Sequence, residues 1–274
     1  MNDLCDDLAA EYGELAERCH ALGVNDWTRV TPFYCWTPRD EIAHLRYFEQ
    51  CAAQALADPP AFRIDESALK KRLSTGEEIS AIARAQYAHL DDSSLLSLWQ
   101  RRCESVIALL RQRNSKDRIP WFGPDMSARS FATARLMETW AHGQDIWDAL
   151  SEQRPASDRI RHIAHLGVTT LAWSFSNRGM KPPAETPFVR LDAPSGAIWT
   201  WGDPATGSWV RGPAEDFCLV VTQRRHAADT ALEIHGEPAT TWLAIAQCFA
   251  GPPAQGPEPG RRNVNHVSRS HLER

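Results

Sequence analysis

The sequence has no long apolar run and no concentration of charge of one sign. No stretch approaches the roughly 20 apolar residues that a membrane-spanning helix needs, so we expect no membrane association. The 30 basic and 35 acidic side chains are interspersed and give a net charge of −5. No basic stripe stands out, so nucleic-acid binding has no electrostatic support.

The sequence also lacks the signs of an exported, disulfide-bonded protein. Its seven cysteines are odd in number, scattered along the chain and free of any C-x-x-C pair. This pattern favours reduced thiols over a disulfide framework. The first residues, MNDLCDDLAAEYGEL, are acidic and amphipathic rather than typical of a signal peptide. We therefore expect a cytoplasmic protein.

What the sequence does contain is helical periodicity, strongest in its first half. The chain has 274 residues, 43% of them apolar, which suffices for two domains with a sizeable core. Apolar spacing predicts helices over residues 3–22, 38–56, 65–90, 92–113 and 127–150. Thr37 and Pro38 suit the start of the second of these helices. The pattern predicts a mainly α fold, in which residues 1–153 form an N-terminal four-helix bundle.

The second half changes character after Pro155. A helix is expected over 157–176, strand signals lie at 188–191, 197–201, 207–211 and 232–234, and helices follow at 213–225 and 237–249. Residues 154–250 are thus predicted to form a small α/β domain. From Gly251 on, proline, glycine and arginine dominate, so we predict a disordered tail over 251–274.

The helix predicted over 127–150 carries ionisable groups on an otherwise small and apolar face. At about 100° per residue, Glu138, His142 and Asp145 fall within about 60° of one another. Burying these groups without compensation would cost several kcal/mol. The alternative without a metal is that this Glu–His pair, four residues apart, is simply a solvated pair on a helix surface.

His44 occupies a similar apolar face on the helix predicted over 38–56. A lone histidine there could simply be a hydrogen-bonded core residue. However, a divalent cation would satisfy His44, Glu138 and His142 together if the two helices face each other. Two histidines and one glutamate form a catalytic type of zinc site, because a coordination position stays open. Asp145, one turn beyond His142, is expected to orient a ligand imidazole.

Two motifs of the first half resemble a known family. Residues 36–45, WTPRDEIAHL, resemble the second-helix motif of the DinB superfamily, and this implies that His44 is a metal ligand. Residues 137–145, METWAHGQD, resemble the fourth-helix motif of the mycothiol-dependent maleylpyruvate isomerase branch. That resemblance implies that Glu138 and His142 complete the site. It implies zinc as the metal, with nickel or iron as alternatives.

The resemblance extends into the second half, and it covers nearly everything from residue 1 to 250. Residues 212–224, GPAEDFCLVVTQR, resemble a helix of that branch's C-terminal domain that ends in an arginine serving activity, here Arg224. Without the resemblance, Arg224 reads as a surface charge at a helix end. The stretches MSARSFATARLMETWAHGQD and AQCFAGPP are similar to an uncharacterised metal-binding subgroup of the branch.

Three functions are compatible with this pattern. The first is a metal-dependent isomerase or S-transferase that uses a low-molecular-weight thiol such as mycothiol on a small, electrophilic, acidic substrate gripped by Arg224. The second is a thiol-independent metal-dependent hydrolase, lyase or cyclase. The third is a non-catalytic metal- or ligand-binding stress protein, in which His89, Asp40 or Asp145 supplies a fourth ligand. The chain is expected to be a monomer or homodimer, with Trp36, Trp121 and Trp140 lining the cleft or filling the bundle.

Overall fold

In a computed structural model, which describes residues 1–262, the chain divides into two compact units at Leu150 and Ser151. The sequence places this boundary three residues later, at 153. Ser151 has a φ of 55°, the left-handed conformation in which helices commonly end. No helix among the described residues combines the length and the apolarity needed to cross a bilayer.

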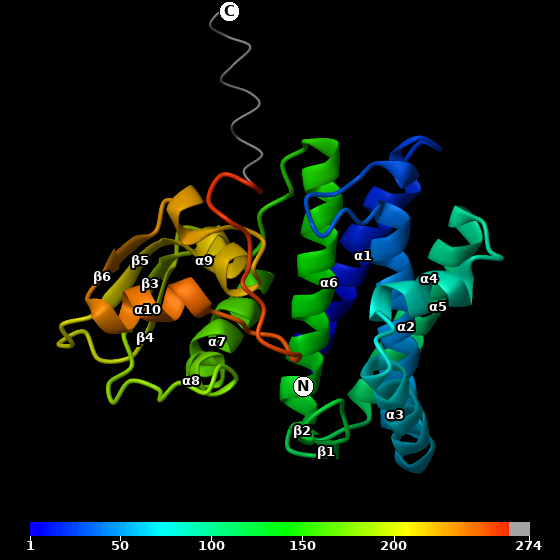
Figure 1. Cartoon of the computed structure of the whole chain (residues 1–274), viewed down its shortest axis with the longest axis horizontal. Helices are drawn as coiled ribbons and strands as arrows, with labels where there is room; N and C mark the ends of the chain where they lie inside the picture. The colour runs from blue at the N-terminus through cyan, green and yellow to red at the C-terminus, as the bar shows by residue number, and fades with distance from the viewer. Residues whose placement is uncertain (263–274) are drawn as a thin grey trace, which may run out of the picture. The chain divides into compact units, whose positions relative to one another are not determined.

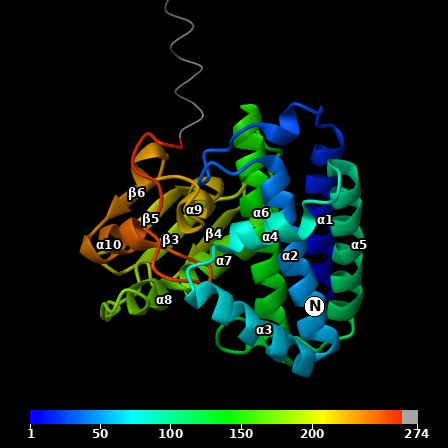
Figure 2. The ribbon, with the colours of Figure 1, turned by 45° about the vertical axis from the view of Figure 1, so that its right-hand side comes forward.

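The regular structure of the first unit is helical apart from one hairpin, whose two strands have two residues each (Figure 1). Its elements are α1 (Asn2–His20), η1 (Asp26–Thr28), α2 (Pro38–Ala57), α3 (Pro59–Ser74), α4 (Ile79–Tyr87), α5 (Asp92–Arg111), β1 (Arg118–Ile119), β2 (Met126–Ser127) and α6 (Ala128–Leu150). The four long helices α1, α2, α5 and α6 form a bundle in which α1 and α2 each pack against both α5 and α6 (Figure 2).

Two helix boundaries differ from the sequence prediction. The helix expected over 65–90 is interrupted after Ser74, where Gly76 takes a φ of +91° that favours glycine. The first part of this helix, α3, begins earlier than predicted, with Pro59 and Pro60 in its first positions behind the capping side chain of Asp58.

The second unit contains a four-stranded sheet and short helices. Its elements are η2 (Asp158–Ile160), α7 (Arg161–Thr169), α8 (Leu171–Ser176), β3 (Phe188–Asp192), β4 (Ile198–Trp201), β5 (Trp209–Pro213), α9 (Ala214–Val221), η3 (Ala227–Asp229), β6 (Glu233–His235) and α10 (Glu237–Ile245). The strand order is β4-β3-β5-β6, with β3 and β5 parallel and both outer pairs antiparallel. The predicted mainly α fold with a small α/β second part is confirmed.

Residues 251–262, the first part of the predicted disordered tail, make several hydrogen bonds to the second unit. The carbonyl of Ala254 accepts a hydrogen bond from Gln223 Nε2 at 3.0 Å. Gly260 N donates to Asp229 at 2.7 Å, and Arg262 Nη1 donates to the Gln223 carbonyl at 2.7 Å. Specific polar contacts therefore hold a segment that composition alone marks as irregular. Residues 263–274, the rest of the predicted tail, lie outside the described residues.

The lack of a side chain at Gly167 lets α7 pack closely against α9. A Cβ atom at Gly167 would stand 2.9 Å from Val221 and 3.0 Å from Phe217, and both of these side chains are buried. We expect Gly167→Ala to destabilise the protein by about 1–3 kcal/mol through overpacking. Gly13→Ala in α1 is the matched control, since its Cβ would meet nothing, and it should stabilise by about 0.5–1 kcal/mol. Urea unfolding of both variants checks this, and equal effects of the two would contradict it.

A buried ion pair joins α2 to α6. Arg135 donates from Nε and Nη2 to one oxygen of Glu49 at 2.9 and 2.7 Å, and both residues are buried. Glu49→Leu should cost about 3–5 kcal/mol, because it leaves the guanidinium buried without its charge partner. The double variant with Arg135→Leu should recover much of that loss. The exposed pair Arg72–Glu77 is the control, and Glu77→Gln should leave the unfolding midpoint unchanged. A Glu49→Leu protein as stable as the wild type would refute this role for the pair.

Candidate metal centre

The start of α2 fixes which residues of that helix face α6. The Thr37 side chain accepts from the backbone N–H of Asp40, and the Asp40 carboxylate accepts from the backbone N–H of Thr37 at 2.9 Å. Pro38 occupies the first helical position, as the sequence predicts. This capping box sets the helix phase, and His44 follows one turn after Asp40.

The three predicted ligands come together. His142 Nε2 lies 3.4 Å from Glu138 Oε2, and His44 Nε2 lies 3.9 Å from the same oxygen. The two imidazole rings have centroids 4.4 Å apart. The side chain of Glu138 is 25% exposed, whereas those of His44 and His142 are 10% and 6% exposed. The cluster is therefore buried but open on the side of Glu138.

This donor set fits a divalent metal such as zinc. With metal–nitrogen and metal–oxygen bonds near 2.1 Å and tetrahedral angles, the two donor atoms stand about 3.4 Å apart. The His142–Glu138 separation has this value, and the His44–Glu138 separation exceeds it by about 0.5 Å, which small side-chain rotations would close. Among the described residues, no further histidine, cysteine or acidic residue joins these three as a fourth ligand. His89 and Asp40, two of the expected fourth ligands, are thus outside the group.

The ionised state of Glu138 also suits a residue that binds a cation. Burial raises the pKa of this carboxyl, but the imidazoles of His142 and His44 and the charge of Arg135 lower it more strongly. The pKa of Glu138 therefore lies well below its usual range, and the side chain is ionised at neutral pH.

A carboxylate that the sequence analysis missed contacts the other side of His142. Glu41 Oε2 lies 2.7 Å from His142 Nδ1, and Glu41 is fully buried in α2. Asp145, expected to orient a ligand imidazole, lies 3.9 Å from the same nitrogen, beyond hydrogen-bond distance. Glu41 thus occupies the place predicted for Asp145. It could have been found, because it precedes His44 by three residues and shares its helix face.

Aromatic rings surround the two imidazoles. The Trp36 ring is stacked on His142 at a centroid distance of 5.8 Å and lies 5.1 Å from His44. Phe33 meets His142 edge-on at 5.4 Å, and Phe48 lies 4.7 Å from His44. Trp36, predicted to line the cleft or fill the bundle, thus packs directly on both imidazoles.

The other two predicted tryptophans are farther from the ligands. Trp121 contacts Phe48 at 6.3 Å and is stacked on Phe62 at 5.8 Å, so it reaches the imidazoles only through another ring. Trp140 lies two residues from both Glu138 and His142 on α6. Two residues correspond to a rotation of about 200°, so the helix directs Trp140 away from the ligands.

Arg224 belongs to the second unit and lies beyond a helix that ends earlier than predicted. The helix α9 stops at Val221, and Gln223 turns the chain with a φ of 59°. The backbone N–H of Arg224 donates to the Leu219 carbonyl at 2.7 Å, and its Nη1 donates to the Thr222 carbonyl at 2.9 Å. Its part in substrate binding stays a prediction.

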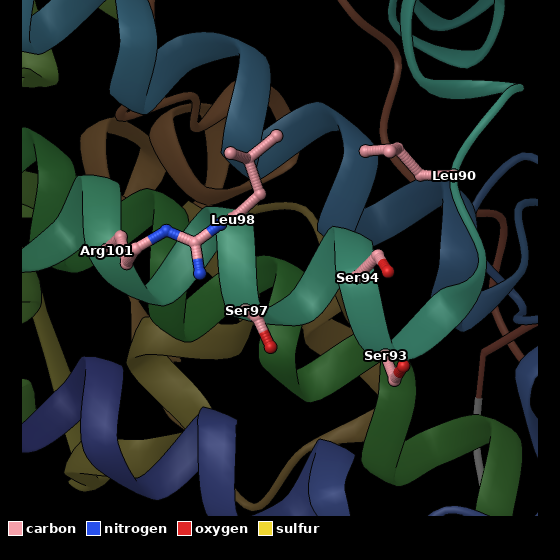
Figure 3. A pocket seen from close by; sticks show the side chains of 6 residues that line it. All are labelled: Leu90, Ser93, Ser94, Ser97, Leu98 and Arg101. Carbon is pink, nitrogen blue, oxygen red and sulfur yellow. The ribbon is translucent and has the colours of Figure 1, made fainter.

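Two hollows in the surface of the first unit lie elsewhere. Figure 3 shows one that is lined by residues from α5 and the turn before it, namely Leu90, Ser93, Ser94, Ser97, Leu98 and Arg101. A second lies beside α2, α4 and α5, near Arg39 and Arg84. Neither is lined by His44, Glu138 or His142, so the chemistry of the side chains identifies the centre more clearly than surface shape does.

Comparisons with known proteins agree with this picture. Residues 8–147 match the family model described as the mycothiol maleylpyruvate isomerase N-terminal domain. Two uncharacterized proteins of Mycobacterium tuberculosis, from strains CDC 1551 and H37Rv, are each 40% identical over 254 residues, which is 91% of this chain and 96% of theirs.

Two solved structures share the fold. One is a mycothiol-dependent maleylpyruvate isomerase, with a TM-score of 0.54 at 13% identity, covering 87% of this chain and 95% of its own. The other is a histidine-to-alanine mutant of such an isomerase, with a TM-score of 0.51 at 13% identity, covering 80% and 87%. With a family model that spans half of its length and a helical bundle that carries the matching residues, this chain belongs to the mycothiol maleylpyruvate isomerase N-terminal domain family.

Proposed function

We propose that this protein is a metal-dependent enzyme of the thiol-dependent isomerase or S-transferase type, with His44, Glu138 and His142 as the ligands of a zinc ion. The observation that carries the proposal is the convergence of these three side chains from two helices at separations that suit zinc. The family match, to a domain named for a mycothiol isomerase, supports the thiol as co-substrate.

The donor set defines what the metal would supply. Two neutral imidazoles and one carboxylate leave a net positive charge, which lowers the pKa of a thiol that reaches the open position. The partly exposed side of Glu138 is where a ligand could approach, and the rings of Phe33, Trp36 and Phe48 shield the imidazoles. Excluding water there strengthens every charge interaction.

The proposed isomerisation conserves atoms and electrons. The thiolate sulfur forms a bond to one carbon of a conjugated double bond, and the π electrons move toward the substrate's carbonyl oxygen. Rotation about the resulting single bond follows. The electrons then return, the carbon–sulfur bond breaks, and the thiol leaves unchanged. An S-transferase would stop after the first step and protonate the adduct. For an acidic substrate, Arg224 is the proposed carboxylate partner.

A thiol-independent hydrolase, lyase or cyclase is the second candidate. The observation that favours it is the aromatic character of the rings that contact both imidazoles. A non-catalytic metal-binding protein would need the metal to be fully enclosed, whereas each of the two groups of candidate ligands among the described residues, which share His142, has three members rather than four.

The ligand assignment predicts the metal content of variants. His44→Ala and His142→Ala should each lose bound zinc and the thermal stabilisation that zinc confers, because binding to the native state adds to its free energy of unfolding. His89→Ala, on an exposed histidine, is the matched control and should keep both. Elemental analysis and thermal shifts with added zinc measure this. Undiminished zinc in both ligand variants would refute the assignment.

The thiol hypothesis predicts a spectroscopic signature in cobalt-substituted protein. Mycothiol should produce a sulfur-to-cobalt charge-transfer band, because its thiol would enter the open coordination position. S-methyl mycothiol, which keeps the sugar parts but has no ionisable thiol, is the control and should give no such band. Identical spectra with the two compounds would contradict the thiol-dependent function and favour the thiol-independent candidate.

A further inference from the structure

We propose that Glu41 is a positioning residue of this centre, which fixes the His142 ring for metal binding and ties the loop of residues 31–36 to it. The inference rests on the proposed metal centre and extends it to a residue outside the ligand set. Glu41 is fully buried in α2, one helical turn before His44. A carboxylate in such a place requires specific partners, because its desolvation is costly.

The contact with His142 determines which ring nitrogen can bind a metal. The nitrogen Nδ1 lies 2.7 Å from Glu41 Oε2, a charge-assisted hydrogen bond in which the imidazole N–H donates. With its proton on Nδ1, the neutral ring presents the lone pair of Nε2, and this nitrogen is the one 3.4 Å from Glu138. Glu41 thus selects the tautomer that the ligand set needs and makes the ring a stronger donor.

The second oxygen of Glu41 connects to the loop. Thr31 Oγ1 donates to Glu41 Oε1 at 3.3 Å, and the backbone N–H of Thr31 donates to the Trp36 carbonyl at 2.6 Å. The loop is closed tightly, with Tyr34 and Cys35 both at positive φ. Its rings Phe33 and Trp36 both pack on His142.

One carboxylate therefore holds the ligand ring from its Nδ1 side and, through Thr31, the loop whose aromatic side chains cover that ring. Asp145, also buried, is the nearest competitor for the positioning role, but its oxygen stands 3.9 Å from Nδ1. Separate substitutions of Glu41 and Asp145 can show which of the two carboxylates positions the His142 ring.

The test is zinc affinity measured by competition with a chromophoric chelator. Glu41→Gln should weaken zinc binding about 10–100-fold, the usual effect of removing a carboxylate behind a ligand imidazole. Asp145→Asn should weaken it less than Glu41→Gln does. Glu66→Gln, which removes a buried carboxylate of α3 paired with Arg63 and Lys70, is the control for general destabilisation and should leave zinc affinity unchanged.

A second readout reports on the ring itself. In zinc-loaded protein labelled with ¹⁵N-histidine, His142 should show a proton on Nδ1 at low field, and this signal should shift or vanish in Glu41→Gln. A wild-type protein that binds no zinc would overturn both this inference and the proposed function. If the wild type binds zinc while Glu41→Gln binds within twofold of it and keeps the Nδ1 proton, the positioning role alone fails.

Discussion

The fold of the first unit depends on the mutual compensation of charges buried between α2 and α6. Three contacts join these helices: Glu41 with His142, His44 with Glu138, and Glu49 with Arg135. Positions rise along α2 as they fall along α6, so the helices run antiparallel. Each group would be costly to bury alone, and a slip by one helical turn would leave several of them without a partner. The contacts thus specify one register, which a purely apolar interface would specify less strictly.

The candidate metal centre lies between the other two contacts, and both of them affect its side chains. Above it, Glu41 takes up the Nδ1 side of His142, so the ring can turn its other nitrogen to a cation. On the other side, His142 and His44 lower the pKa of Glu138 most strongly, and the charge of Arg135, although paired with Glu49, adds to this effect. The contacts that hold α2 and α6 together are therefore the same contacts that orient His142 and keep Glu138 ionised.

Much of this could be read from the sequence, and the reason for the rest is physical. The helical period places His44, Glu138 and His142 on inward faces, and family resemblance selects them as ligands. Glu41 shares the face of His44, yet a helical wheel cannot tell which residue of another helix it will meet. Its partner lies 101 residues away, and the partner of Arg135 lies 86 residues away. Contacts between residues so far apart in the sequence decide whether a charged side chain is buried. Such contacts also bind residues 251–262.

The same pairings constrain the substrate. Arg135 is buried and paired with Glu49, and the side chains that pack on the two imidazoles are aromatic. An acidic substrate would therefore be neutralised by the metal itself or by a cation other than Arg135, and Arg224 is the residue that family resemblance predicts for this role. A neutral, planar substrate would need no such cation and could rely on the rings of Phe33, Trp36 and Phe48.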